Sequence, residues 1–397
     1  MLFVFRVPSV TLYAIVCPRN ARMRDCFMDD KNKDWLSLMR LPYTAGFRLL
    51  RLIDVRGSPS GILQMDAREL ERAGFGHEAM QRLQHPDWES IEKDLEWLQA
   101  PAHHFIPYSD NRYPWLLKEI SDPPPGLFVR GNPEVLNSVQ LGIVGSRNPS
   151  PAGKGNARLF AGQMAQLGIT VTSGLASGID YCAHLGALDG SGATIAVLGN
   201  GPDQVYPRHH AELADRIADN GALISEFVTG TPPLAGNFPR RNRLISGLSA
   251  GVLVVEAAEK SGSLITAHHA LEQGREVFAI PGSIHNPLTR GCHALIKQGA
   301  KLVESCADIL EELNVIAHVT ATSPGKAEPE ISCQLDNDDM LLLKYIAHDP
   351  VSIDRLVELT GLTVAVVSSM LLTMEIRGVI AQTAGGCYAR IKWKTTN

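Results

Sequence analysis

Short apolar runs alternate with helical segments between residues 139 and 314, and this alternation limits the possible folds more than any other feature of the chain. Seven runs have the length and β-branched content of buried strands: 141–146, 169–174, 194–199, 222–227, 251–257, 276–282 and 300–305. Apolar strands separated by amphipathic helices are typical of a parallel sheet with helices on both faces. The pattern predicts an α/β protein with a doubly wound, Rossmann-like parallel sheet.

The flanking regions have other patterns and predict further domains. Residues 29–100 contain short segments with apolar residues three and four apart, which indicates a small helical domain. Residues 101–314 then form the Rossmann-like domain. We expect a linker at 315–335, where Pro, Gly, Ser and Thr are frequent. Residues 336–397 show helices followed by a hairpin, the order of a winged helix-turn-helix.

The first 28 residues fit none of these domains. They are apolar, but Arg6 and Pro8 interrupt them, and the run is too short to span a bilayer. No clear A-x-A cleavage site follows, so we expect an extension without a place in the fold, with Met23 or Met28 as the true start. A secretory signal peptide is the alternative.

Composition restricts the function and the compartment. The formal net charge is -5, so the chain cannot coat nucleic acid by bulk charge, and any polyanion site must be local. Seven cysteines without CxxC spacing are typical of free thiols in a reducing compartment. We therefore expect a cytoplasmic protein that does not associate with a membrane.

Glycine and serine follow nearly every predicted strand. In an open parallel sheet, ligands bind at the carboxyl ends of the strands. The residues at this edge include Gly145, Ser146, Arg147, Ser173, Gly174, Lys260, Ser261, Gly262 and Ser263. Glycine lets backbone amides approach an anion, and a following helix N-terminus adds partial positive charge. Turn geometry alone also favours Gly and Ser, but so many such loops together with cations predict phosphate binding.

Three arginines, Arg240, Arg241 and Arg243, lie in the motif FPRRNR before the fifth predicted strand. We expect this motif to be a loop that enters a helix. Arginine binds phosphate through two parallel hydrogen bonds and can stack on a base. Because cations near a helix N-terminus oppose the helix dipole, we expect an anion there, and the backbone of a nucleic acid would supply it. A solvated basic helix start is the alternative.

Known cofactor and catalytic motifs are not matched. The string GSRNPSPAGKG lacks dinucleotide-binding spacing, and no P-loop occurs, so we expect no NAD, ATP or other cofactor. The paired histidines lack a carboxylate at metal-ligand spacing, so we expect no metal. Asp180 and His184 lie four residues apart, but without a nucleophile elbow we expect Asp180 to cap a helix or fix a loop.

The tail lacks the charge of a DNA reader. Residues 336–391 contain seven acids and four Lys or Arg, and the third predicted helix ends with its only cation, Arg377. A winged helix that reads a DNA groove needs cations on that helix. We expect the tail to contact protein or to pack as an accessory.

Six segments resemble, in order, the bacterial DNA-processing protein A family (DprA, also called Smf). They are GIVGSRNPSPAG, VTSGLASGIDYCAHLGAL, TIAVLGNGPDQVYP, FPRRNRLISGLS, VVEAAEKSGSLITAHHALEQGREVFAIPGS and GCHALIKQGAKLV. The N-terminal helices resemble the SAM-like domain of the family, and the tail resembles the winged-helix domain that some members carry.

The resemblance implies a protein that binds single-stranded DNA and is not an enzyme. It implies protection of incoming DNA during natural transformation, loading of the RecA recombinase and a homodimer. The ssDNA pocket of the family matches Gly145, Ser146 and Arg147, with the arginine-rich motif nearby. Some relatives carry a lysine just before the phenylalanine of that motif, whereas Asn237 stands here.

Two other functions remain open at this point. One is an enzyme acting on a nucleotide or nucleoside phosphate, similar to phosphoribohydrolases with this type of sheet. Glu256 is the only obvious carboxylate for it at the sheet edge. The other is an interaction scaffold that retains the phosphate-binding loops without using them.

Overall fold

The computed structural model describes residues 32–42, 46–320, 345–346, 351–376, 380–383 and 387–390. The chain divides into two units, Met1–Thr322 and Ser323–Asn397. The predicted N-terminal extension lies outside the described residues, and so does the first predicted helix of the tail (338–348) apart from residues 345 and 346.

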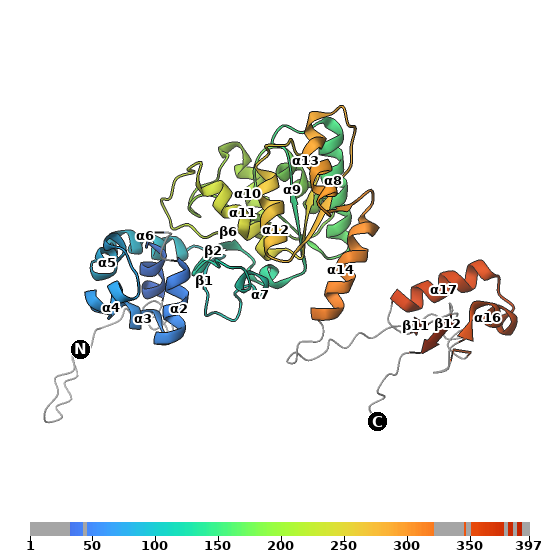
Figure 1. Cartoon of the computed structure of the whole chain (residues 1–397), viewed down its shortest axis with the longest axis horizontal. Helices are drawn as coiled ribbons and strands as arrows, with labels where there is room; N and C mark the ends of the chain where they lie inside the picture. Colours follow the sequence, from blue (N-terminus) through green and yellow to red (C-terminus); the bar gives the residue numbers. More distant parts are fainter. Residues whose placement is uncertain are drawn as a thin grey trace, which may run out of the picture. The chain divides into compact units, whose positions relative to one another are not determined.

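A nine-stranded sheet forms the centre of the first unit (Figure 1). Its strands are β1 (His103–Pro107), β2 (Gly126–Gly131), β3 (Gln140–Val144), β4 (Thr170–Ser173), β5 (Thr194–Val197), β6 (Ala222–Ser225), β7 (Gly251–Val254), β8 (Glu276–Ala279) and β9 (Lys301–Leu302). The spatial order is β1-β2-β6-β5-β4-β3-β7-β8-β9. All seven predicted strands are present, and each ends before its predicted end. They pair in parallel from β6 to β9, whereas β1 and β2 add an antiparallel edge.

Seven helices connect and cover these strands. They are α8 (Pro151–Gln166), α9 (Ile179–Asp189), α10 (Ala211–Asn220), α11 (Asn237–Leu248), α12 (Ser263–Glu272), α13 (Arg290–Lys297) and α14 (Cys306–Thr320). Helices α11, α12 and α13 share a core with Val252 and Val254 of β7. Helices α8, α9 and α14 share another with Leu253 and Val255. Because side chains alternate along a strand, these two cores lie on opposite faces, which confirms the doubly wound sheet.

The predicted N-terminal helices are present and pack on the antiparallel edge of the sheet. They comprise a helix over 32–39, α2 (Gly46–Arg56), α3 (Pro59–Leu63), α4 (Ala67–Arg72), α5 (His77–Gln84) and α6 (Trp88–Leu98). Their apolar core, which includes Leu36, Ile62 and Ile91, extends to Phe105 of β1 and Phe128 of β2. Between 101 and 138 the structure has β1 and β2, with α7 (Trp115–Lys118) and a 3₁₀ helix (Pro133–Asn137).

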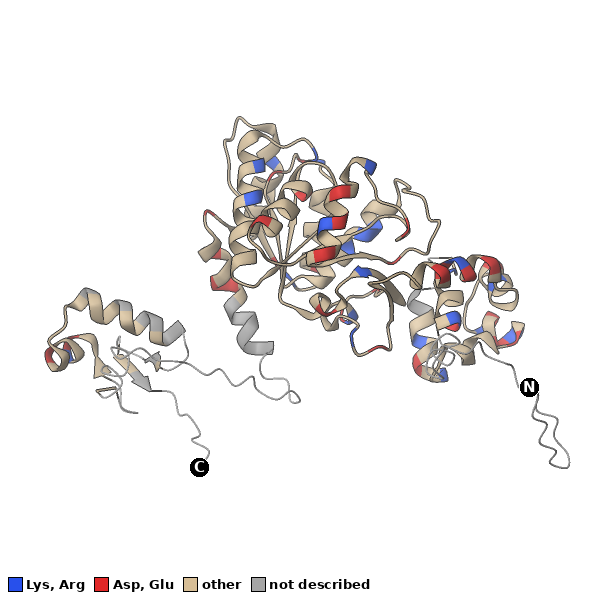
Figure 2. Cartoon of the chain, turned by 180° about the vertical axis from the view of Figure 1, so that it is seen from behind, with Lys and Arg blue, Asp and Glu red and all other residues tan. Residues whose placement is uncertain are grey.

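The second unit has the predicted winged-helix elements. They are β10 (Val351–Ser352), α16 (Ile353–Thr360), α17 (Val364–Ile376), β11 (Ile380–Thr383) and β12 (Cys387–Arg390), with strands in the order β10-β12-β11. Leu356, Val367, Leu371 and Ile380 share its core. Helix α17 carries no Lys or Arg (Figure 2).

The predicted linker begins inside a helix. Helix α14 runs to Thr320, past the expected domain end at 314. Residues 321–344 lie outside the described part of the chain.

Candidate nucleic-acid interface

A cavity of about 670 Å³ opens at the carboxyl ends of the strands. Loops after β3 and β7 and the start of α11 form much of its wall. The strands that follow β3 in the sequence, β4 to β6, lie on one side of it, and β7 to β9 lie on the other. The strand order therefore reverses at β3. Such a topological switch point is where open α/β sheets bind ligands.

The loop after β3 is fixed by backbone contacts. The amide of Ser146 donates to the carbonyl of Glu256 (2.6 Å), and the carbonyl of Ser146 accepts from the amide of Ile179 (3.1 Å). Gly178 has φ +89°, and a Cβ there would lie 2.4 Å from the Ser146 carbonyl oxygen. Arg147 follows as an exposed residue on the cavity wall. The loop thus holds an exposed cation on a rigid backbone.

The loop after β7 brings a second cation to the same cavity. Lys260 is exposed there, and the hydroxyl groups of Ser261 and Ser263 lie 2.7 Å apart. The side-chain amide of Asn242 donates to the carbonyl of Gly262 (3.3 Å), which ties this loop to α11. Helix α12 begins at Ser263, so the positive end of its dipole is at the cavity.

Arg241 forms the inner wall of the cavity. Its guanidinium donates to the carbonyl of Gly174 (2.9 Å) and to the carbonyl of Val197. A Cβ at Gly174 would lie 2.6 Å from the guanidinium, so only glycine leaves room for it. Burial lowers the pKa of Arg241 to about 10, which leaves the side chain charged at neutral pH.

Asp180 also lines the cavity, and it fixes a loop as we predicted. Its carboxylate accepts from the amides of Gly174 (3.1 Å) and Ala176 (3.4 Å). Burial raises the pKa of Asp180, although Arg241 acts in the opposite direction. Asp180 therefore shapes the β4–α9 turn beneath the cations.

Two aromatic residues that the sequence analysis did not single out also line the cavity. The guanidinium carbons of Arg147 and Arg241 each lie 5.9 Å from the ring centroid of Phe238. The ring of Tyr206 lies 5.6 Å from that of Phe238 at an angle of 45°. Phe238 is part of the FPRRNR motif, which lies between the predicted strands 222–227 and 251–257. This position was the sequence signal that could have identified Phe238 as a site residue. Aromatic faces among cations are suited to unpaired bases.

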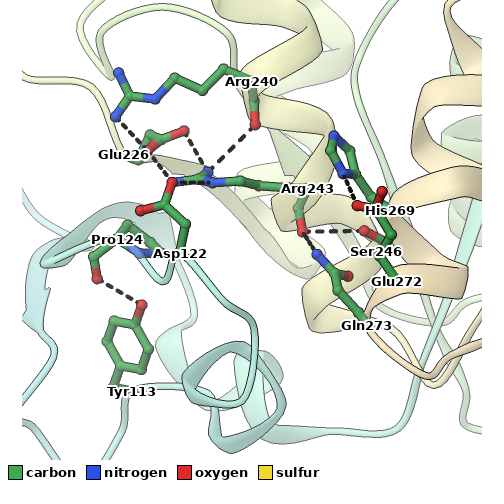
Figure 3. Close-up of polar contacts among 10 residues, drawn as sticks. All are labelled: Tyr113, Asp122, Pro124, Glu226, Arg240, Arg243, Ser246, His269, Glu272 and Gln273. Carbon is green, nitrogen blue, oxygen red and sulfur yellow. Dashed lines mark hydrogen bonds and ion pairs between the residues drawn. The ribbon is translucent and has the colours of Figure 1, made fainter. Parts of the chain in front are cut away.

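The other two arginines of the motif have carboxylate partners in the protein. Arg243 forms two 2.8 Å hydrogen bonds with Glu226, and Arg240 forms one of 2.9 Å with the same carboxylate (Figure 3). Arg243 also contacts Asp122 at 3.2 Å. The side chain of Glu226 is 1% exposed. We call these four residues the Glu226 network.

The secondary structure of this motif differs from the prediction. We expected a loop, but α11 begins at Asn237 and includes the whole motif. Pro239 is compatible with this because proline is tolerated in the first turn of a helix. The expected anion near this helix start is present as Glu226 and Asp122, which belong to the protein itself.

The twelve predicted site residues fall into two groups. Eight of them line the cavity: Gly145, Ser146, Arg147, Arg241, Lys260, Ser261, Gly262 and Ser263. Ser173 is buried, and its hydroxyl donates to the carbonyl of Ile143 (2.6 Å). Gly174 lies behind Arg241, and Arg240 and Arg243 belong to the Glu226 network.

The candidate catalytic residues have structural partners. Glu256 accepts from the amide (2.8 Å) and the hydroxyl (2.5 Å) of Ser150 at the start of α8. The ring of His184 is fully buried against the hydroxyl of Thr194 (2.8 Å), and burial lowers its pKa to about 3. Neither side chain is on the cavity wall.

The part of the chain that the structure describes has neither a cluster of metal ligands nor a membrane-spanning helix. No group of three His, Cys, Asp or Glu residues there could hold a metal ion. Among the described helices, none has both the length and the apolar character needed to cross a membrane.

Comparison with known proteins gives the family. The model of DNA recombination-mediator protein A matches residues 104–314, and that of the DprA winged helix domain matches 326–386. Protein Smf of Escherichia coli (strain K12) is 44% identical over 364 residues, which cover 90% of this chain and 95% of the relative. DNA processing protein DprA of Bacillus subtilis (strain 168) is 48% identical over 209 residues, or 52% of this chain and 70% of the relative.

A solved structure agrees with the sequence relatives. DNA processing protein A from Streptococcus pneumoniae is 37% identical with a TM-score of 0.62, over 70% of this chain and 95% of that chain. The predicted family and the predicted winged helix are thus confirmed, and the chain belongs to the DNA recombination-mediator protein A family, DprA/Smf.

Proposed function

We propose that this protein binds single-stranded DNA in the cavity at the carboxyl ends of β3 and β7. Backbone phosphates would lie on Arg147, Lys260 and the amides of the two loops, with Arg241 behind them. The observation that carries this proposal is the arrangement of Phe238, which lies 5.9 Å from both Arg147 and Arg241 within one cavity.

The chemistry of the cavity favours a single strand over a duplex. Stacking on an aromatic ring requires a base that is free of its partner strand, and such stacking tolerates any base. Duplex binding without base contacts relies instead on many phosphate contacts over a broad basic surface. The chain has a formal net charge of -5, and the cations of the site gather at one cavity.

The binding of labelled oligo-dT at several salt concentrations tests this site. Arg147→Ala and Lys260→Ala should each weaken binding about tenfold and lower the salt slope by about one, because each removes one phosphate contact. Arg158→Ala is a charge-matched control, since this arginine is exposed on α8 and paired with Asp189. Unchanged affinity and slope in both cavity variants would overturn the assignment.

The wider role that we propose is that of a recombination mediator in the cytoplasm. It would protect incoming DNA during natural transformation, load RecA onto it and act as a homodimer. The family description supports mediation of recombination, and the thiols of Cys182, Cys292 and Cys306 are compatible with a reducing compartment. RecA filament formation on strands covered by single-strand binding protein, with and without this protein, tests the loading step. Sedimentation tests the dimer.

We also propose that the cavity has no catalytic activity. Glu256, the carboxylate that the phosphoribohydrolase alternative needs, binds Ser150 at the start of α8. Asp180 accepts two backbone hydrogen bonds beneath Arg241. Incubation of the purified protein with nucleoside monophosphates should release no free base, and release of a base would favour the enzyme.

A further inference from the structure

The segment between β6 and α11, residues 226–236, forms one wall of the cavity. We call it the β6–α11 loop. Pro233 and Ala235 of this loop line the cavity, and Phe238 follows directly in α11. The position of the loop therefore affects how much room remains beside the aromatic ring.

The cavity half of this loop is held by little more than its own turns. In the described structure, the amide of Leu234 donates to the carbonyl of Pro232 (2.9 Å), and the amide of Asn237 donates to that of Leu234 (3.0 Å). The side chain of Leu234 is 55% exposed. Contacts at the two ends of the loop must therefore determine where this wall stands.

One end of the loop is bound by the N-terminal helices. Oδ1 of Asp94, on α6, accepts from both the amide (3.0 Å) and the hydroxyl (2.6 Å) of Thr229. Oδ2 of Asp94 pairs with Arg40 at 2.7 Å. The Asp94 side chain is 0% exposed, and a buried carboxylate is tolerated only when it is paired and hydrogen-bonded. Loss of the Thr229 contacts would leave this carboxylate under-coordinated, so the arrangement is strongly specified.

The remaining anchors come from the Rossmann-like domain itself. The amide of Gly230 donates to Asp203 (3.0 Å), and the carbonyl of Thr231 accepts from the amide of Gly201 (2.9 Å). Glu226 begins the loop and is held by the two arginines of α11. Among these polar anchors, Asp94 is the one that the N-terminal helices provide, and Val228 of the loop also packs against their apolar core.

We propose that Asp94 is a positioning residue for single-stranded DNA: it holds Thr229 and thereby the cavity wall that carries Pro233 and Ala235. This inference rests on the proposed function. It makes the helical region part of the binding machinery although Asp94 itself does not line the cavity.

The test combines DNA affinity with the mobility of the loop in the full-length protein. Asp94→Ala should weaken oligo-dT binding about fivefold, because a displaced wall loses part of the stacking of a base. The salt slope should stay unchanged, because no phosphate contact is removed. Backbone amides of 228–236 should exchange hydrogen faster than in the unchanged protein.

A second variant protects the test against misfolding. Thr229→Val keeps the shape of the side chain and the amide contact but removes the 2.6 Å hydroxyl contact with Asp94. Thr229→Val should also weaken oligo-dT binding and speed amide exchange in the loop, each by less than Asp94→Ala does. Asp94→Asn retains an oxygen that can accept from Thr229, so it should bind DNA more tightly than Asp94→Ala.

Leu70→Ala is the matched control for general damage to the helical region. Leu70 is 1% exposed in the core of that region and belongs to α4, whereas the hydrogen bonds to the loop come from α6. It should lower the free energy of unfolding but leave DNA affinity and loop exchange unchanged. Equal loss of affinity in Leu70→Ala and Asp94→Ala would reduce Asp94 to a structural role and overturn the inference.

The remaining outcomes separate the two proposals. If Asp94→Ala and Thr229→Val bind oligo-dT as tightly as the unchanged protein, the inference is wrong, whatever the loop exchange shows. If the unchanged protein itself does not bind oligo-dT, the proposed function is wrong, and the inference falls with it.

Discussion

The two sides of α11 carry the same type of side chain in different electrostatic settings. On the cavity side, Arg241 donates to carbonyl oxygens beside Phe238. On the other side, Arg240 and Arg243 meet the carboxylate of Glu226. A guanidinium hydrogen-bonded to a buried carboxylate attracts an external phosphate less than one whose hydrogen bonds go to neutral carbonyls, although the charge of Asp180 also acts on Arg241 without a hydrogen bond between them. The partner, and not the residue type, therefore determines which arginine can serve an external anion.

The largest effect should come from breaking the Glu226 network. Glu226→Ala removes both 2.8 Å hydrogen bonds of the buried Arg243 and leaves it the contact with Asp122 at 3.2 Å, so the free energy of unfolding should fall by about 3–5 kcal/mol. Urea denaturation measures this loss. The control is Asp189→Ala, which breaks an exposed pair with Arg158 and should cost less than about 1 kcal/mol. Similar losses in both variants would show that the Glu226 network stabilises the fold no more than an exposed ion pair does.

A smaller effect should follow a change on the cavity side. Phe238→Ala should weaken oligo-dT binding by about 1–3 kcal/mol, because it removes the surface on which a base stacks. The salt slope should not change, since the ring carries no charge. Phe238→Leu serves as the control that keeps apolar volume without an aromatic face, and it should also bind weakly. Full affinity in Phe238→Leu would show that the ring fills space and does not stack.

The smallest effect concerns the carboxyl group beneath Arg241. Burial raises the pKa of Asp180 above its ordinary value, so this carboxyl group gains a proton at a higher pH than an exposed aspartate. Protonation removes a negative charge from the cavity, and DNA affinity should therefore rise as pH falls through that pKa. The affinity of Asp180→Asn should lack this component when both proteins are titrated in parallel. Identical pH profiles would contradict the assignment of this charge to the DNA site.

The seven parallel strands were predictable because each apolar run lies between turn residues and helical segments. In 251–257, for example, the apolar run supplies both faces of the sheet, with Val252 and Val254 on one face and Leu253 and Val255 on the other. The antiparallel pairing of β1 with β2 was not predicted, because His103 and His104 interrupt the apolar pattern of β1.

It was harder to predict which arginines of the FPRRNR motif pair with carboxylates and which one lines the cavity. The partner carboxylates, Glu226 and Asp122, lie outside the motif, and Asp122 is 121 residues from Arg243 in the sequence. One signal was present, however. Arg240 and Arg243 are three apart and share a helical face, whereas Arg241 does not, but this helps only if the motif is recognised as a helix.

The salt dependence of ssDNA binding by a matched pair of variants, Arg147→Gln and Arg240→Gln, tests the central claim most directly. Both substitutions remove one positive charge near α11. If cavity cations hold the phosphates, Arg147→Gln should lower the salt slope by about one, and Arg240→Gln should leave it unchanged. A slope that falls for Arg240→Gln and stays constant for Arg147→Gln would contradict the account, because it would place the DNA on the side of the Glu226 network.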